Sequence, residues 1–224
     1  MAGSATKGLI VAPNRTGSRE RYRAQVREEI KEHAREQIAT AGVSALSLNA
    51  IAKRVGMSGP ALYWYFASRD DLITELIRDA YRSLADILRA EFDSGADISA
   101  IAHATRAWAL ADPQRYFLIY GTPVPGYHAP DDTTAISSEI MAVLIEAFAA
   151  QPSVVAATPF DAHLENHREW AAGHEVPVAT LHRAVSFWTR MHGVLSLELA
   201  GHFAGMGFDP ALLFEAELNT LLAH

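Results

Sequence analysis

The chain of 224 residues contains no cysteine, so it can form no disulfide bond, thiolate nucleophile or cysteine-based zinc site. It also has no uninterrupted apolar stretch of the roughly 18 residues that a membrane-spanning helix requires. Its first residues show no long apolar run followed by a small-residue cleavage site, so no signal peptide is predicted. We therefore expect a cytoplasmic protein with no membrane partner.

Familiar catalytic signatures are absent as well. The sequence has no G-x-S-x-G, no H-E-x-x-H and no P-loop, so we expect no enzyme activity. The best metal-binding candidate is His163 with His167, near Glu165, Glu169 and His174. Histidines four residues apart share a helix face and can bind zinc. Scattered histidines on a polar surface are far commoner, however, so no metal and no other cofactor is predicted.

No strand-like alternation persists and no repeat is visible, whereas helical periodicity runs through most of the chain. Half the residues are hydrophobic, which is enough for a sizeable core. The sequence predicts an all-α fold. Residues 1–18, rich in Gly, Ser, Thr and Ala, are expected to form a disordered arm. Helices are expected at about 19–41, from 69 to the low nineties, and at 98–111, 133–150, 178–200 and 210–222, with a short piece after Pro113.

The segment from Ser47 to Arg69 holds two short helical patterns separated by Gly56-Met57-Ser58. Gly56 stands where a helix end favours a residue with positive φ. Ser58 is placed to cap the second helix, and Pro60 is tolerated in its first turn. The buried face of the first pattern consists of Leu48, Ile51, Ala52 and Val55. This spacing is typical of a helix-turn-helix, which also explains exposed aromatic residues in the second helix.

Charge is distributed unevenly along the chain. The net charge is −7, yet residues 1–70 carry a balance of +5 and residues 71–224 one of −12. A basic N-terminal third on an acidic body is expected when only one end of a protein meets phosphate. We therefore expect a DNA-binding domain at residues 19–70 and a larger helical domain at residues 71–224.

These features together resemble the tetracycline-repressor (TetR) family of bacterial transcription regulators. The resemblance is specific over about residues 25–75, through SLNAIAKRVGMS, ALYWYF and FASRDDL. It is looser in ADPQRYFLIYGTPVPGY and FWTRMHGVL; the latter is similar to the Trp-x-x-x-His-Gly signature of one branch, here Trp188, His192 and Gly193. The resemblance implies a homodimer that binds a palindromic operator in double-stranded DNA and responds to a small-molecule effector.

It also implies roles for single residues. Asn49 would contact a base, Arg69 would clamp a phosphate in place of the family's commoner lysine, and Trp64 would pack at the groove edge. The residues expected at the DNA interface are Ser47, Asn49, Lys53, Ser58, Gly59, Pro60, Ala61, Tyr63, Trp64, Tyr65 and Arg69. Alternatives remain open: Tyr63 and Tyr65 can cover a small core, and the serines cap helices in any case.

One inference is independent of the resemblance. Between Ser58 and Phe66 there is no Lys, Arg, Asn or Gln, so the second helix cannot read guanine bidentately. Asn49 can pair with adenine N6 and N7. The remaining specificity would come from methyl contacts, water and DNA shape.

The resemblance assigns a ligand pocket and a dimer interface to the C-terminal domain. Pocket candidates are Tyr81, Trp108, Tyr116, Phe117, Tyr120 and His192; interface candidates are Val185, Trp188, Leu195, Leu199, Leu213 and Leu218. Packing inside one protomer is the alternative for about half of the interface set. The leading hypothesis is a ligand-responsive, DNA-binding repressor; the alternative is a helical small-molecule or metal-binding protein whose helix-turn-helix is only structural.

Overall fold

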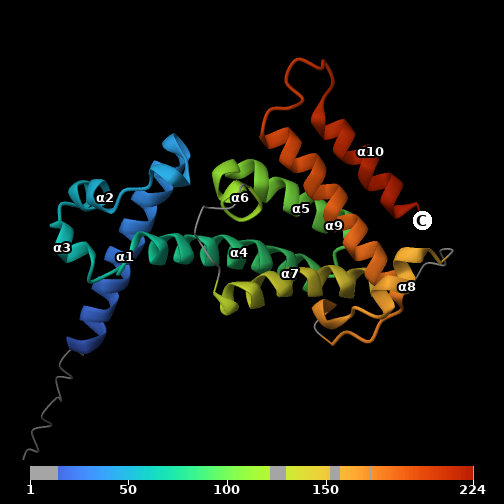
Figure 1. The fold of residues 1–224 in the computed structure, drawn as a ribbon, viewed down its shortest axis with the longest axis horizontal. Helices are drawn as coiled ribbons and strands as arrows, with labels where there is room; N and C mark the ends of the chain where they lie inside the picture. The colour runs from blue at the N-terminus through green and yellow to red at the C-terminus, as the bar shows by residue number, and fades with distance from the viewer. Residues whose placement is uncertain (1–14, 122–129, 152–156, 172, 224) are drawn as a thin grey trace, which may run out of the picture.

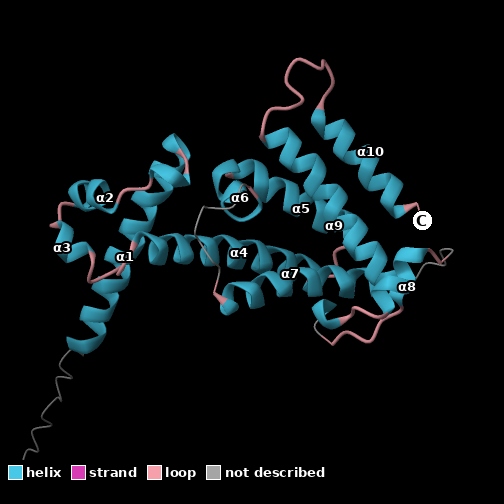
Figure 2. Cartoon of the chain, viewed as in Figure 1, coloured by secondary structure: helices cyan, strands magenta, loops and turns pink. Residues whose placement is uncertain are grey.

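The computed structural model describes residues 15–121, 130–151, 157–171 and 173–223, and in this part of the chain every regular element is helical (Figure 2). This confirms the all-α fold class. The N-terminal elements are α1 (Arg15–Ala41), the 3₁₀ turn η1 (Val43–Ala45), α2 (Leu48–Val55), α3 (Gly59–Leu62) and α4 (Arg69–Asp93). The remaining elements are α5 (Ile98–Ala111), α6 (Pro113–Tyr120), α7 (Asp131–Ala149), α8 (Pro159–Glu165), η2 (Glu169–Ala171), α9 (Val178–Leu199) and α10 (Pro210–Leu222).

Helix ends agree closely with the sequence pattern, with two differences. Helix α1 begins at Arg15, inside the expected arm, whose first 14 residues lie outside the described part. Helix α3 ends at Leu62, and two of the N–H groups that follow bond three residues back: Trp64 N–H donates to Ala61 O and Tyr65 N–H to Leu62 O. The aromatic residues after Leu62 therefore lie on a tighter turn.

Side-chain caps fix the helix-turn-helix. The hydroxyls of Ser47, Ser58 and Ser68 accept the N–H groups of Ala50, Ala61 and Asp71 at 3.4, 3.3 and 3.0 Å. Gly56 has φ 76°, a left-handed conformation that closes α2 and that side chains larger than hydrogen rarely adopt. The angle between α2 and α3 is thus set locally.

Two hydrophobic cores share one long helix. The N-terminal core lies among α1–α3 and the first turns of α4, where Leu72, Ile73, Leu76 and Ile77 are buried. The C-terminal core includes Leu84, Ala85 and Leu88 of the same helix together with α5 to α10. In Figure 1, α4 runs from the helix-turn-helix at one end of the molecule to the larger helical body. None of the helices in the described residues is both long and apolar enough to cross a membrane.

Candidate nucleic-acid interface and aromatic cluster

The surface of α2 and α3 presents large aromatic groups to solvent. Trp64 is 81% exposed and Tyr63 is 50% exposed. With Asn49, Gly59 and Pro60 they line a shallow hollow. Figure 1 places this surface at the end of the molecule away from α9 and α10. Because apolar exposure of this extent is unusual on a small capped unit, the surface is the leading candidate for contact with another molecule.

Asn49 projects into this hollow from the first turn of α2. A β-carbon on Gly59 would lie 3.2 Å from Asn49 Oδ1, tighter than an ordinary contact. Lys53, one turn further along α2, is also exposed. The arrangement places an amide that can read adenine and an ammonium group on the same side of α2.

The remaining candidates of the helix-turn-helix have more internal partners. Ser47 donates its N–H to Gln37 Oε1 at 3.0 Å, while its hydroxyl caps α2. Ala61 and Tyr65 are half-buried. The carbonyl of Tyr65 accepts a hydrogen bond from Arg27, whose guanidinium also lies 4.3 Å from the centre of the Phe66 ring. These contacts tie the turn after α3 to α1.

Arg69 lies differently from the expected phosphate clamp. Its Nη2 donates to Val43 O at 2.6 Å and its Nε to Leu46 O at 3.1 Å. Its Nη1 lies 3.7 Å from a carboxylate oxygen of Asp70. The guanidinium therefore joins the start of α4 to the segment before α2, so its structural role is to position α2.

Aromatic rings from α4, α6 and α9 form a second candidate site, which we call the aromatic cluster: Tyr81, Tyr116, Tyr120, Trp188 and His192. The Tyr120 ring centre lies 4.2 Å from that of His192 and 5.3 Å from that of Trp188. Tyr116 and Tyr81 lie 5.2 and 6.0 Å from Tyr120. The cluster thus brings together four of the six predicted pocket residues.

Polar atoms in the aromatic cluster are only partly paired. Tyr116 OH lies 3.0 Å from His192 Nδ1 and 2.8 Å from Ser196 Oγ. Among the described residues, neither Tyr120 OH nor His192 Nε2 has a hydrogen-bond partner, although both atoms are buried. Burial lowers the pKa of His192 to about 4 and raises that of Tyr120, so both side chains are neutral near pH 7. Buried unpaired polar atoms are costly and are therefore characteristic of ligand sites.

Two predicted pocket residues lie at the edge of the cluster or away from it. Phe117 contacts the cluster through the ring of Tyr116, with ring centres 5.6 Å apart. The Trp108 ring packs under the Arg115 guanidinium, at 4.4 Å, and its Nε1 donates to Ser83 Oγ at 3.1 Å. The contacts of Trp108 therefore assign it to the α4–α5–α6 packing.

The predicted dimer residues divide into three kinds. Leu195 and Leu218 are buried inside the protomer, at 0% and 1% exposure, so their assignment to a dimer interface is wrong. Trp188 belongs to the aromatic cluster, with its ring 4.0 Å from His192. The half-buried residues are Val185, Leu199 and Leu213. Their exposed apolar neighbours are instead Leu197, at 44%, and Leu212, at 69%.

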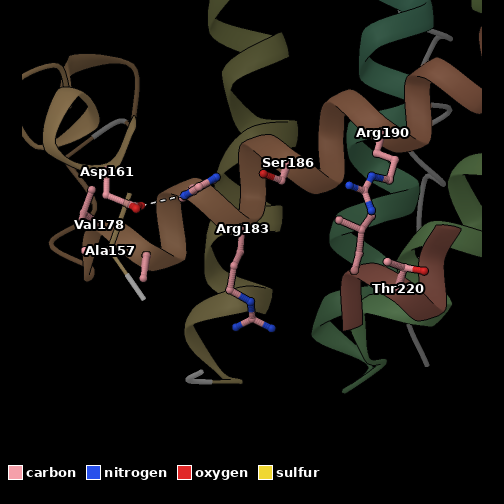
Figure 3. A pocket seen from close by; sticks show the side chains of 10 residues that line it. Ala157, Asp161, Val178, Arg183, Ser186, Arg190 and Thr220 are labelled. Atoms are coloured by element: carbon pink, nitrogen blue, oxygen red, sulfur yellow. Dashed lines mark hydrogen bonds and ion pairs between the residues drawn. The ribbon is translucent and has the colours of Figure 1, made fainter. Parts of the chain in front are cut away.

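A cavity of about 310 Å³ lies on the outer side of α9, where α8 and the end of α10 meet it. Figure 3 shows Asp161 on one side of it and Arg190 and Thr220 on the other. Asp161 accepts hydrogen bonds from Thr158 and pairs with His182 at 2.8 Å, contacts that lower the pKa of the carboxyl to about 2. Among the described residues that line the cavity, the only carboxylate is therefore already paired.

The histidine cluster considered for metal binding is not assembled as a ligand set. The rings of His163 and His167 stack with centres 4.1 Å apart, and His167 Nδ1 lies 2.8 Å from His163 O. In the described ranges no group of three or more His, Asp or Glu side chains is placed to hold a metal ion.

Family comparisons give two matches in separate parts of the chain. The model described as "Bacterial regulatory proteins, tetR family" matches residues 30–76, which include α2 and α3. The model described as "Tetracyclin repressor-like, C-terminal domain" matches residues 98–221, more than half of the chain.

Individual proteins agree with these matches. The HTH-type transcriptional regulators Rv1816 of Mycobacterium tuberculosis (strain ATCC 25618 / H37Rv) and Mb1846 of Mycobacterium bovis are each 38% identical, over 93% of this chain and 96% of theirs. The crystal structure of the regulatory-protein candidate SCO4313 is 70% identical, with a TM-score of 0.86 over 92% of this chain and 98% of that one. A protein of unknown function from Rhodococcus sp. RHA1, 21% identical with a TM-score of 0.63 over 88% of this chain and 92% of that one, shares the fold.

Proposed function

Because the chain belongs to the TetR family of DNA-binding transcriptional regulators, we propose that it represses genes as a homodimer on a palindromic operator and that a small molecule in the aromatic cluster releases it. The family consists of regulators and not of enzymes. The alternative, a binding protein whose helix-turn-helix is only structural, loses its basis because the helix-turn-helix itself matches the regulatory family.

The observation that carries the DNA-binding part is the exposure of Trp64 and Tyr63 beside Asn49. An amide can read adenine, and aromatic edges can pack on thymine methyl groups in the major groove. Lys53 adds a cation for a phosphate. Arg69 acts in this proposal through the position of α2.

The dimer part of the proposal rests on the outer face of α9 and α10. Leu197 of α9 and Leu212 of α10 are exposed, and residues of the same two helices line the 310 Å³ cavity. A second copy related by a two-fold axis would bury both leucines and fill the cavity with its own side chains. Such a dimer places two helix-turn-helices on one operator.

Helix α6 connects the two sites. Tyr116 and Tyr120 lie in the aromatic cluster, whereas Leu118 packs against the N-terminal core. Leu118 and Arg115 also line a hollow whose opposite wall includes Lys31 of α1. An effector that moves α6 would therefore displace α1 and change the distance between the two helix-turn-helices of the dimer. This change shifts the population away from the form that can bind DNA.

DNA binding by full-length protein tests the proposal. We expect the protein to bind the DNA upstream of its own gene with sequence preference and with an affinity that falls steeply as salt rises. Trp64→Ala should weaken this complex by about tenfold, or ~1.4 kcal/mol, without changing the melting temperature. Met206→Ala, which truncates a 63% exposed side chain in the α9–α10 loop, serves as the matched control. Failure to form a salt-sensitive, sequence-preferring complex would contradict the DNA-binding role.

A further inference from the structure

The unpaired atoms of the aromatic cluster constrain the chemistry of what binds there. Tyr120 OH and His192 Nε2 are both buried and, within the described residues, both lack partners. Their rings lie 4.2 Å apart, on α6 and α9. Each such group lowers the stability of the folded protein unless a ligand satisfies it. The free protein therefore has two unpaired hydrogen-bonding groups close to each other.

The proton positions in the cluster follow from the contacts of Tyr116. Its hydroxyl lies 3.0 Å from His192 Nδ1 but 3.3 Å from His192 O, and 2.8 Å from Ser196 Oγ. We assign Ser196 as the donor to Tyr116, and Tyr116 as the donor to Nδ1, the nearer of the two acceptor atoms of His192. Since neutral imidazole carries one proton, that proton then lies on Nε2. Both unpaired groups, Nε2–H and Tyr120 O–H, are thus donors.

None of the described side chains of the aromatic cluster carries a charge at pH 7. Tyr81, Tyr116, Tyr120 and Trp188 are uncharged, and burial keeps His192 neutral at pH 7 by lowering its pKa to about 4. The nearest cation along α6, Arg115, is held on the other side against Trp108. A charged ligand would lose its hydration here without gaining a partner of opposite sign.

We propose that the effector is an uncharged molecule with a flat apolar ring system and a hydrogen-bond acceptor, such as a ketone carbonyl, which accepts from His192 Nε2–H and Tyr120 O–H. This inference rests on the proposed effector role of the cluster and specifies its ligand class. The flat body would stack among the rings of Trp188, Tyr116 and Tyr81, as aromatic groups do at 4.5–7 Å. The carbonyl offers two lone pairs to the two donors.

Four naphthalene probes test the class, because they share one ring system and differ in one substituent. They are 2-acetylnaphthalene, which is a neutral acceptor; 2-isopropylnaphthalene, which has nearly the same shape and no acceptor; the anion 2-naphthoate; and the cation 2-naphthyltrimethylammonium. Dissociation constants are measured by calorimetry on full-length protein. We expect 2-acetylnaphthalene to bind at least about fivefold more tightly than each of the other three, the factor expected of one net hydrogen bond.

Two variants connect this selectivity with the named atoms. Tyr120→Phe and His192→Phe should each reduce the preference for the ketone over 2-isopropylnaphthalene. Tyr120→Phe should also leave the melting temperature unchanged or raise it, because it removes a buried hydroxyl that has no partner. Tyr22→Phe, which removes a phenol hydroxyl from a 66% exposed side chain on α1, should change neither quantity.

The outcomes separate this inference from the proposed function. Equal affinity for the ketone and its isopropyl analogue, tighter binding of either ion, or no binding of any probe overturns the ligand class. Anisotropy of labelled operator DNA is recorded with the same probes. If the ketone binds selectively but the DNA remains bound, the ligand class is supported while release by the effector is contradicted.

Discussion

The carboxamide of Asn49 and the α-carbon of Gly59 lie so close that a β-carbon on residue 59 would be 3.2 Å from Asn49 Oδ1. Asn49 belongs to α2 and Gly59 to the first turn of α3. Glycine at this position lets the two helices approach and leaves space for the amide. The position of the group best suited to read a base thus depends on the absence of a side chain at residue 59.

The first prediction follows from this contact. Gly59→Ala should push the amide of Asn49 aside by a few tenths of an ångström and so relax base preference in the same direction as Asn49→Ala. Competition binding with operators changed at single base pairs measures the effect; one lost bidentate contact corresponds to about 1–3 kcal/mol of discrimination. Gly17→Ala is the control, because a β-carbon there meets nothing within 4 Å. Unchanged base preference in both Gly59→Ala and Asn49→Ala would show that Asn49 does not read a base.

The second prediction concerns Arg69. Arg69→Ala leaves the carbonyls of Val43 and Leu46 without their donor, and we expect unfolding free energy to fall by about 1–2 kcal/mol, since the side chain is one-third exposed. Arg69→Lys keeps the charge but cannot reproduce the two-pronged contact, so it should also destabilise. Urea unfolding measures the free energy of unfolding of both variants. A lower salt slope of DNA binding with unchanged stability would instead restore the phosphate role.

The third prediction concerns the outer face of α9 and α10. Leu197→Glu and Leu212→Glu should each convert the dimer to monomer at micromolar concentration, because a carboxylate buried without a partner costs several kcal/mol. Sedimentation velocity gives the oligomeric state. Leu110→Glu changes a leucine of α5 that is 40% exposed, close to the 44% of Leu197, and should leave the proposed dimer intact. A dimer that survives both α9–α10 substitutions would place the interface elsewhere.

The fourth prediction is a pH dependence. Burial lowers the folded-state pKa of His192 to about 4, below its ordinary value of 6.5. The unfolded chain therefore binds a proton before the folded one does, and stability should fall by about 2 kcal/mol from pH 7 to pH 5. His192→Gln should lack this part of the loss. The hydrogen bond with Glu215 raises the pKa of His103, so His103 contributes stability that is lost as pH rises, and this contribution is the same in both proteins. Urea unfolding at the two pH values measures the difference, and identical pH dependence would contradict the buried, neutral histidine.

The fold could be predicted to within a few residues because its signals are local. Capping serines, Gly56 and the prolines at helix starts depend on near neighbours in the chain. The contact between Arg27 of α1 and the Tyr65 carbonyl after α3 could not be predicted, because it joins residues that are 38 positions apart in the chain. The proposed domain boundary at residue 70 stays a prediction.

The sequence predicted which kinds of candidate site the protein has, but not every residue that belongs to them. Exposure of Trp64 and the meeting of Tyr116, Tyr120 and His192 agree with the pattern of the sequence. The pattern failed for Leu195 of α9 and Leu218 of α10, because both helices are strongly apolar and hydrophobicity alone does not tell which side faces the protomer core. Leu197 shares the helical phase of Thr189, Arg190 and Gly193, which are exposed on the same helix.

Helix α4 contributes buried residues to both hydrophobic cores, so the two cores are coupled in denaturation. Since its first turns cannot melt without exposing Leu76 and Ile77, and its last turns without exposing Leu84 and Leu88, the two halves should unfold cooperatively in one transition. A compound bound among the rings of α6 and α9 would then raise the melting temperature of the helix-turn-helix as well. Hydrogen exchange in α2 thus becomes a reporter of occupancy at a site that α2 does not touch.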